Sequence, residues 1–238
     1  MKKILIVQHY GSIGGSGVSL LATLEVLSSY YNIVIYVPEN PPDLLNLLRK
    51  KGYTAKTFNF RIGTIRHFSG GNSIFDPKFW FHFMSSFFQF NYWKKIIEKE
   101  EPDLIIVNSM VLAWMSLISK HRKSICFVRE TMRGRRNSPI NVYIRKLLDK
   151  FSLVFFLSEY DLRNFGLKKA EVSVCPDFVT SDNNEISSKT FEREELGLKN
   201  EDFVLLYLGG ISKLKGIHVL LKAMKYLKGE HIKLIILG

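Results

Sequence analysis

The sequence predicts an α/β fold in which helices cover both faces of a parallel sheet. Short, continuous, β-branched apolar runs alternate with longer amphipathic runs along the first 180 residues. Continuous apolar runs are typical of strands buried on both faces, and their alternation with helices is typical of doubly wound sheets. The predicted strands are Lys3–Val7, Ile33–Val37, Ala55–Phe60, Leu104–Asn108, Ser124–Val128, Leu153–Leu157 and Val172–Cys175.

The runs between these strands have the spacing of amphipathic helices, with apolar residues three or four positions apart. They are bounded by glycine, proline and polar residues, which favour turns. The predicted helices are Gly17–Ser29, Pro41–Lys51, Phe79–Lys99, Val111–Lys120, Pro139–Lys150 and Glu159–Phe165.

A polar stretch interrupts this alternation and predicts a linker at 181–200, after a first domain at 1–180. The pattern then restarts with a strand, a glycine-rich loop, a helix and a second strand. One βαβ unit of this size is too small to hold a core alone, so 201–238 is expected to be the truncated start of a second domain. Its predicted elements are Phe203–Leu208, Ile217–Leu227 and Ile232–Leu237.

The composition excludes several classes of protein. A chain of 238 residues with 46% hydrophobic content is neither disordered nor a disulfide scaffold. Cys126 and Cys175 lie in apolar runs and are expected to be buried free thiols in a reducing compartment. The six histidines show no metal-ligand spacing, so no metal site is expected. The apolar run at Ile4–Val7 is too short for a signal peptide, which favours a cytoplasmic location.

Positive charge is concentrated in one part of the chain. The net charge is +12, and residues 120–150 contain ten basic and two acidic residues. A local basic region indicates an anionic partner such as a phosphate, a nucleotide or an anionic lipid. A nucleic-acid partner rests only on the basic run at 133–136 and is the weakest of the alternatives.

Two glycine-rich loops each follow a strand and open a helix. The first, His9–Gly17, lies at the carboxyl edge of the predicted sheet, where helix N-termini bind phosphate. It matches a dinucleotide fingerprint only loosely, because Leu20 stands where a third glycine is needed. Glu39 could still hold the ribose of a nicotinamide cofactor, and a turn with positive φ is the simplest alternative.

The second loop, Gly209–Gly216, carries Lys213 and Lys215 beside a helix N-terminus. Cations in this place suit a diphosphate. The loop is not a P-loop, because Lys215 is followed by glycine rather than by serine or threonine. The alternative is a turn with two solvated lysines.

The segment Tyr207–Ala223 resembles the second-domain signature of family 4 retaining glycosyltransferases. The resemblance extends along the chain in the right order, through Gly14–Gly17, Pro102–Ser109, Val174–Val179 and Arg193–Leu198. It implies the GT-B fold, here a Rossmann-like N-terminal domain with an incomplete second Rossmann-like unit. It also implies transfer of a sugar from a nucleotide sugar to a hydroxyl of a glycan or lipid-linked acceptor, with retention of configuration and without a metal.

The resemblance assigns roles to individual residues. It places the donor diphosphate near Gly14, Gly15, Gly17, Lys213 and Lys215, and it makes Arg129 and Glu130 catalytic candidates beside the reacting sugar. His9 and Ser158 become candidates on the acceptor side. The simpler alternatives are a surface ion pair for Arg129 and Glu130 and a helix cap for Ser158.

The sequence departs from the family pattern at two places. The family's arginine before the loop lysine falls on Gly210, and the family's paired glutamates have no match before the chain ends at Gly238. Most of the nucleotide pocket is therefore expected to be missing. The alternative function is a non-catalytic module that binds a glycan, a lipid or a partner, or a subunit of a split glycosyltransferase.

An aromatic stretch at 79–95 is the most unusual local feature, with nine aromatic residues among 17. A helix that lies on a sheet needs only one apolar stripe, so this excess indicates a second apolar contact. A membrane surface, reached together with the basic region 120–150, would place the protein peripherally on the inner membrane face. The alternatives are a partner chain and a helix buried between layers.

Overall fold

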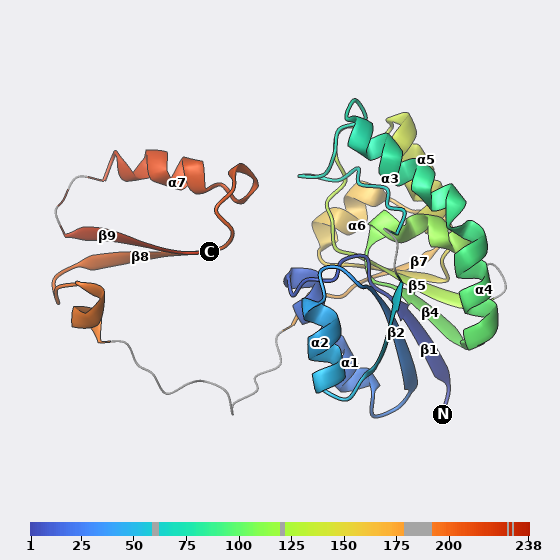
Figure 1. The fold of residues 1–238 in the computed structure, drawn as a ribbon. Coiled ribbons are helices and arrows are strands. Elements are labelled where there is room, and N and C mark those ends of the chain that lie inside the picture. Colours follow the sequence, from blue (N-terminus) through green and yellow to red (C-terminus); the bar gives the residue numbers. More distant parts are fainter. Residues whose placement is uncertain (59–61, 120–121, 179–191, 228, 230) are drawn as a thin grey trace. The chain divides into compact units, whose positions relative to one another are not determined.

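The structure is a computed structural model that describes residues 1–58, 62–119, 122–178, 192–227, 229 and 231–238. The chain divides into two compact units, Met1–Thr180 (unit 1) and Ser181–Gly238 (unit 2), as Figure 1 shows. Residues 181–191 of the predicted linker lie outside the described residues. The rest of that linker contains a short 3₁₀ helix, η2 (Arg193–Leu196).

Unit 1 is built on one sheet of seven parallel strands in the order β3-β2-β1-β4-β5-β6-β7. β1 pairs with β2 on one side and with β4 on the other, so the strand order reverses between β1 and β4. Loops leave such a switch point in opposite directions and open a crevice at the carboxyl edge. The strands are β1 (Lys3–Val7), β2 (Asn32–Pro38), β3 (Thr54–Phe58), β4 (Leu104–Val107), β5 (Lys123–Val128), β6 (Leu153–Phe156) and β7 (Glu171–Val174).

Helices cover both faces of this sheet (Figure 1), which gives unit 1 two cores. Ile4 and Ile6 of β1 pack with side chains of α1 and α2, whereas Leu5 and Val7 pack with side chains of α4, α5 and the 3₁₀ helix η1. The predicted doubly wound α/β fold is therefore confirmed. The helices are α1 (Gly15–Leu27), α2 (Asp43–Lys50), α3 (Pro77–Phe88), α4 (Phe90–Glu100), η1 (Met110–Leu117), α5 (Pro139–Leu148) and α6 (Glu159–Phe165).

The single helix predicted at Phe79–Lys99 is wrong, because the chain forms α3 and α4 with a break at Gln89. Asp76 begins α3 by accepting a hydrogen bond from the Lys78 backbone N–H at 2.9 Å. The buried positions of the two helices keep the same helical phase across the break, so the apolar periodicity does not reveal it.

The amphipathic helix predicted at Val111–Lys120 is also wrong, because the type of helix differs. The segment from Met110 to Leu117 is a 3₁₀ helix, and its residues from Met110 to Ser116 are all buried. A segment that is apolar on all sides is buried on all sides. It shows no amphipathic period, so its sequence does not indicate which type of helix it forms. Ser109 begins it by accepting a hydrogen bond from the Val111 backbone N–H at 3.2 Å.

A buried carboxylate joins α4 to the sheet. Glu100, at the end of α4, is only 4% exposed and accepts hydrogen bonds from three side chains on three strands. These donors are Lys56 Nζ at 2.6 Å, Tyr36 Oη at 2.8 Å and Lys3 Nζ at 2.9 Å. One carboxylate therefore joins α4 to β1, β2 and β3.

Unit 2 is a parallel βαβ unit. Strands β8 (Phe203–Leu208) and β9 (Ile232–Leu237) pair over their whole length, with the bounds that the sequence predicts. Helix α7 (Ile217–Met224) connects them, preceded by a single 3₁₀ turn, η3 (Lys213–Lys215). Several large apolar side chains of this unit are more than half exposed, among them those of Leu206, Leu208 and Val219.

Candidate functional site

The carboxyl edge of the sheet in unit 1 brings together polar residues that are far apart in the sequence. His9 follows β1, Asn108 follows β4, Arg129 follows β5 and Asp177 lies shortly after β7. Carboxyl ends of parallel strands meet at one edge, and β1 and β4 flank the switch point. This edge is therefore the place where a ligand is expected in such a sheet.

A buried amide network closes the base of the crevice. The Asn108 side chain donates to Gln8 Oε1 at 2.7 Å and to the Ser16 carbonyl at 3.2 Å. Gln8 in turn donates through Nε2 to Ser16 Oγ at 3.1 Å. Since Ser16 lies in the first turn of α1, the network fixes the helix N-terminus to the ends of β1 and β4.

Arg129 extends this network across the sheet. Its Nε donates to Asn108 Oδ1 at 3.0 Å, and its guanidinium forms an ion pair with Asp177. Asp177 also accepts a hydrogen bond from Ser19 Oγ of α1 at 2.6 Å. The Arg129 side chain is only 7% exposed, so it acts first as a buried connection between the ends of β4, β5 and β7. The alternative of a simple surface ion pair does not describe it.

Glu130 is held by three donors at the N-terminal end of η1. Its carboxylate accepts hydrogen bonds from Ser109 Oγ, from the Met110 backbone N–H and from the Arg129 backbone N–H, the last two at 3.1 Å. Burial raises the pKa of Glu130, and these donors oppose the rise. Glu130 is not among the residues that line the two cavities described below. Its geometry is that of a carboxylate that orders the start of η1.

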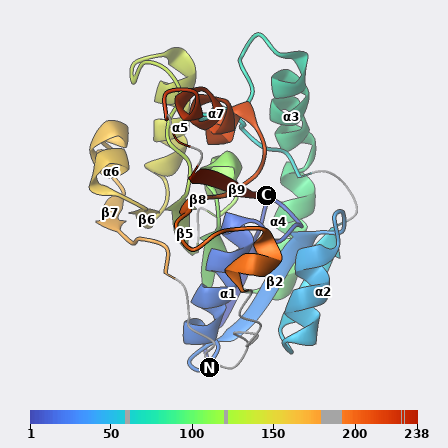
Figure 2. The ribbon, with the colours of Figure 1, turned by 90° about the vertical axis from the view of Figure 1, so that its left-hand side faces the viewer.

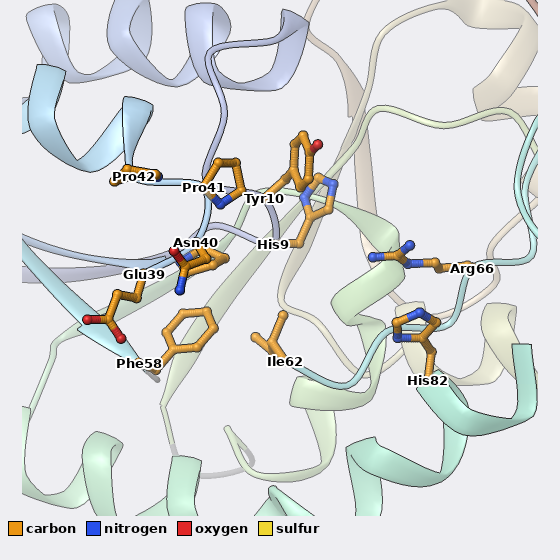
Figure 3. Close-up of a pocket in the computed structure, with 11 residues that line it drawn as sticks. His9, Tyr10, Glu39, Asn40, Pro41, Pro42, Phe58, Ile62, Arg66 and His82 are labelled. Atoms are coloured by element: carbon orange, nitrogen blue, oxygen red, sulfur yellow. The ribbon is translucent and has the colours of Figure 1, made fainter. Parts of the chain in front are cut away.

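A cavity of about 840 Å³ opens beside the end of β1 (Figure 3). Phe58 and Ile62 form an apolar wall, and the guanidinium of Arg66 points towards His9. A smaller cavity of about 360 Å³ shares His9, Tyr10 and Arg66 with it. The larger cavity is lined by His9, Tyr10, Pro38, Glu39, Asn40, Pro41, Pro42, Phe58, Ile62, Arg66 and His82.

His9 is the titratable group with the clearest perturbation in this cavity. Burial, with smaller contributions from the charges of Arg66 and Arg129, lowers the pKa of His9 to about 4. The imidazole is therefore neutral near pH 7. Its Nδ1 is buried and makes no hydrogen bond within the described residues.

The first glycine loop has room beside its backbone. A Cβ placed on Gly14 or on Gly15 would meet nothing within 4 Å, whereas one on Gly17 would lie 3.2 Å from the Ser12 carbonyl. None of these three glycines has a positive φ, so the simple alternative of a turn that needs positive φ is wrong here. Gly14 is the N-cap of α1, which leaves the first N–H groups of the helix open to a ligand.

Ser158 caps α6. Its hydroxyl accepts a hydrogen bond from the Asp161 backbone N–H at 3.2 Å and donates to Asp161 Oδ2 at 2.8 Å. This is the geometry of an N-cap, as in the alternative weighed for this residue. Its acceptor-side role stays a prediction.

In unit 2 the second glycine loop presents both of its lysines to solvent. Lys213 and Lys215 lie in η3, just before α7, and both are exposed. Ser212 begins this turn by accepting a hydrogen bond from the Lys215 backbone N–H at 3.4 Å. Gly216 has a φ of +77°, which a side chain would strain, and it links η3 to α7.

Sequence reasoning missed several residues of the edge. Asn108 and Asp177 carry a usable signal, because each polar residue follows shortly after a buried strand. Ile62 and Arg66 carry none, because the long connection between β3 and α3 has no periodicity that would bring it back over the end of β1. His82 carries none either, because it lies on the aromatic helix α3, whose pattern does not show which side faces the cavity.

Comparisons with known proteins agree with this architecture. A family model described as "Glycosyl transferases group 1" matches residues 188–238. No curated protein matches the chain. Among solved structures, Anabaena HepE in complex with UDP and glucose aligns with a TM-score of 0.66 at 20% identity, covering 99% of this chain and 60% of HepE. The chain thus spans about 60% of the length of that protein.

Two further solved structures have the same arrangement. A glycosyltransferase from Rickettsia africae aligns with a TM-score of 0.60 at 15% identity, covering 100% of this chain and 68% of that one. The lipopolysaccharide outer core galactosyltransferase WaaB aligns with a TM-score of 0.58 at 14% identity. The alignment covers 99% of this chain and 60% of WaaB. At these identities the likeness shows the fold, which is Rossmann-like and of the GT-B type.

Proposed function

We propose that the complete protein is a hexosyltransferase of the GT-B type. It moves a sugar from a nucleotide sugar to a hydroxyl of a glycan or lipid-linked acceptor, retains the anomeric configuration, and serves polysaccharide biosynthesis in the cytoplasm. The observation that carries the proposal is the match of residues 188–238 to the group 1 glycosyltransferase model, because this segment contains the Gly209–Gly216 loop.

The donor side of the proposal rests on charge. Departure of a nucleoside diphosphate develops negative charge, which preorganised cations and helix N-termini stabilise. Lys213 and Lys215 supply the cations on unit 2, and the open N-terminus of α1 at Gly14 and Gly15 supplies backbone donors on unit 1. On each unit by itself, such groups can stabilise the negative charge of a diphosphate without a metal.

The acceptor side rests on the cavity in unit 1. Its apolar wall suits the face of a sugar ring or the start of a lipid chain, and neutral His9 can accept a hydrogen bond from the acceptor hydroxyl. Arg129 positions this edge through Asn108 and Asp177. Glu130 acts through the start of η1, and contact of either residue with the sugar stays a prediction.

The test uses UDP-glucose, which is bound in one of the solved HepE complexes. The complete protein is incubated with radiolabelled UDP-glucose, and in parallel with the corresponding GDP-sugar, together with glycan and lipid-linked acceptors. We expect label in the acceptor fraction, and we expect Lys215→Ala to weaken binding of the nucleotide by about tenfold, the loss of one charge-assisted contact. Lys222→Ala, an exposed lysine on α7, is the matched control.

Two results would contradict this proposal in different ways. If neither UDP nor GDP raises the unfolding temperature and no label is transferred, the chain does not handle nucleotide sugars. If acceptor glycans bind at the His9 cavity but no nucleotide sugar is consumed, the protein is a binding module or one subunit of a divided enzyme.

A further inference from the structure

Helix α3 turns its aromatic side outwards. Five large apolar side chains on its outer face are exposed, and we call them the aromatic stripe. They are Trp80 (52% exposed), Phe81 (63%), Met84 (47%), Phe87 (52%) and Phe88 (82%). At about 100° per residue these side chains fall within an arc of about 120°, with no charged residue among them. A helix on the surface of a water-soluble domain normally presents polar residues on this side.

The polar side of α3 faces inwards instead. His82, Ser86 and Gln89 are all less than 8% exposed and lie on the side of the helix opposite to the stripe. The loop from Ile62 to His67 packs against this side, and the Thr64 backbone N–H donates to the His82 carbonyl at 3.2 Å.

The packing of this loop leaves no freedom to rotate the helix. A Cβ on Gly63 would lie 2.3 Å from Ser86 Cα, so the loop backbone is in direct contact with the backbone of α3. The outward direction of the aromatic stripe is therefore built into the fold.

The end of the stripe nearest the α3 N-terminus is held in place by its neighbours. Trp80 Nε1 donates to the Ile74 carbonyl at 2.7 Å, and Phe75, next to Ile74, is 89% exposed. The apolar surface therefore continues from the aromatic stripe onto the segment before α3.

Basic residues flank this surface. Lys78 is exposed on the first turn of α3. Arg133 donates to the Gly71 carbonyl at 2.7 Å, which fixes the arginine-rich turn at 133–136 to the segment that precedes α3. Helix α5 follows that turn and meets α3 through the rings of Phe83 and Tyr143, 5.9 Å apart. Figures 1 and 2 both show α3 and α5 at the same end of unit 1.

The acidic residue nearest to the stripe in sequence is already engaged. Asp76 accepts hydrogen bonds from the Lys78 backbone N–H at 2.9 Å and from Asn72 Nδ2 at 2.7 Å. The segment 71–88 thus holds one lysine and one engaged carboxylate, and the three arginines at 133–136 add the net positive charge.

We propose that the aromatic stripe of α3 and the basic turn at 133–136 form a docking surface for the interface of an anionic lipid bilayer. Aromatic side chains settle at the boundary between headgroups and acyl chains, and nearby basic residues are attracted to anionic headgroups. Within the described residues no helix is long and apolar enough to cross a bilayer.

The positive charge of this surface favours an anionic bilayer as its partner over a second copy of the chain. The turn at 133–136 contains three arginines and no acidic residue, so two copies that met through this surface would bring like charges together. An anionic bilayer offers the opposite charge together with an apolar layer.

The test measures binding of the whole chain to vesicles without any sugar donor, so its result is independent of the proposed transferase activity. Vesicles of phosphatidylcholine alone are compared with vesicles that contain equal parts of phosphatidylcholine and phosphatidylglycerol. We expect flotation with the anionic vesicles at low salt and weaker binding at high salt. The double variant Phe81→Ser with Phe88→Ser should bind at least about tenfold more weakly.

The matched control is Tyr30→Ser, an exposed aromatic residue (69%) outside the stripe, which should bind like the unmodified protein. Thermal unfolding of both variants checks that the exposed substitutions leave the fold intact. Arg135→Ser should reduce binding only at low salt, because its contribution is electrostatic.

Tryptophan fluorescence reports the contact directly. Trp93 and Trp114 are at most 3% exposed, so a change in emission on adding vesicles comes from Trp80. We expect a blue shift with anionic vesicles and quenching by brominated lipid. The proposal is overturned if the protein stays in solution with anionic vesicles at low salt, or if the double variant binds as well as the control. Emission from Trp80 that is already blue-shifted before vesicles are added would show that protein covers the stripe, which also overturns it.

Discussion

Replacement of Glu100 by glutamine tests how α4 is joined to three strands of the sheet. The variant Glu100→Gln keeps the shape of the side chain and its bond to the Tyr36 hydroxyl. It removes the charge that pairs with Lys56 Nζ at 2.6 Å and with Lys3 Nζ at 2.9 Å. We expect a less stable protein with the same fold, because two ammonium groups lose their partner.

The magnitude follows from the pKa of this carboxyl. Burial alone would raise the pKa of Glu100, but the hydrogen bonds from Lys56, Lys3 and Tyr36 outweigh it and lower the pKa from 4.5 to about 2. That difference corresponds to about 3 kcal/mol. Since the two lysine side chains are 29% and 43% exposed, solvent screening reduces the expected loss to about 2 kcal/mol.

The stability difference between the unmodified protein and Glu100→Gln should depend on pH. A carboxyl whose pKa is lower in the folded state stabilises the fold fully above its unfolded pKa, and this stabilisation is lost as the pH falls through the folded pKa. The unmodified protein should therefore exceed Glu100→Gln in stability at pH 7 and lose that advantage between about pH 4.5 and pH 2.

Urea unfolding followed by circular dichroism measures the difference at each pH. At pH 7 the variant should also unfold about 4–8 °C lower, as a loss of this size implies for a unit of this length. Glu98→Gln on the same helix is the control. Glu98 is 62% exposed and lies 3.9 Å from Lys94, so its loss should cost less than about 0.5 kcal/mol. Equal effects of the two substitutions, or a difference that persists at pH 2, would refute the reasoning.

Three further predictions concern the site and its support. Gly63→Ala should cost about 1–3 kcal/mol in urea unfolding, because its Cβ would collide with the backbone of Ser86, whereas Gly14→Ala should cost less. The ring protons of His9 should titrate near pH 4 in NMR spectra, and a titration near pH 6.5 would show that the cavity is hydrated. Asp177→Asn should lower stability by about 1 kcal/mol and loosen the end of β7, seen as faster amide exchange there.

Much of the fold could be predicted because its strands are unusually continuous in their apolar character. Runs such as Ile4–Val7 and Leu104–Val107 leave no polar side for solvent, and only a sheet covered on both faces accommodates them. Where periodicity was lost, the prediction failed. The residues of η1 are buried all round, so their sequence could not distinguish a 3₁₀ from an α-helix.

The candidate site was less predictable than the fold. Residues that directly follow strands, such as His9 and Arg129, could be placed at the carboxyl edge because the topology brings all these ends together. The network that joins Arg129 to Asp177 could not be foreseen, because it depends on how far the chain travels after β7. Arg66 is positioned by backbone contacts of a loop, and such contacts leave no pattern in the sequence.

The apolar periodicity of the sequence could not predict which side of α3 faces the core, and the reason is a different one. Both sides of the helix contain large aromatic residues, so hydrophobicity alone favours neither side for the core. The choice is made by small residues: Ser86 and Gly63 allow two backbones to approach closely, and Trp114 Nε1 donates to the Gly63 carbonyl at 2.8 Å and anchors the loop. Close approach needs a side with small side chains, and α3 has one such side only.

The same loop connects the two proposals. Residues 62–67 hold the inner side of α3 and also supply Ile62 and Arg66 to the His9 cavity, and α3 itself contributes His82 to that cavity. The cavity and the aromatic stripe therefore lie on opposite sides of one helix. A bilayer in contact with the stripe would lie one helix diameter, about 10 Å, from the cavity. This distance suits an acceptor whose lipid part stays in the membrane while its sugar reaches His9, and a free soluble glycan would gain nothing from it.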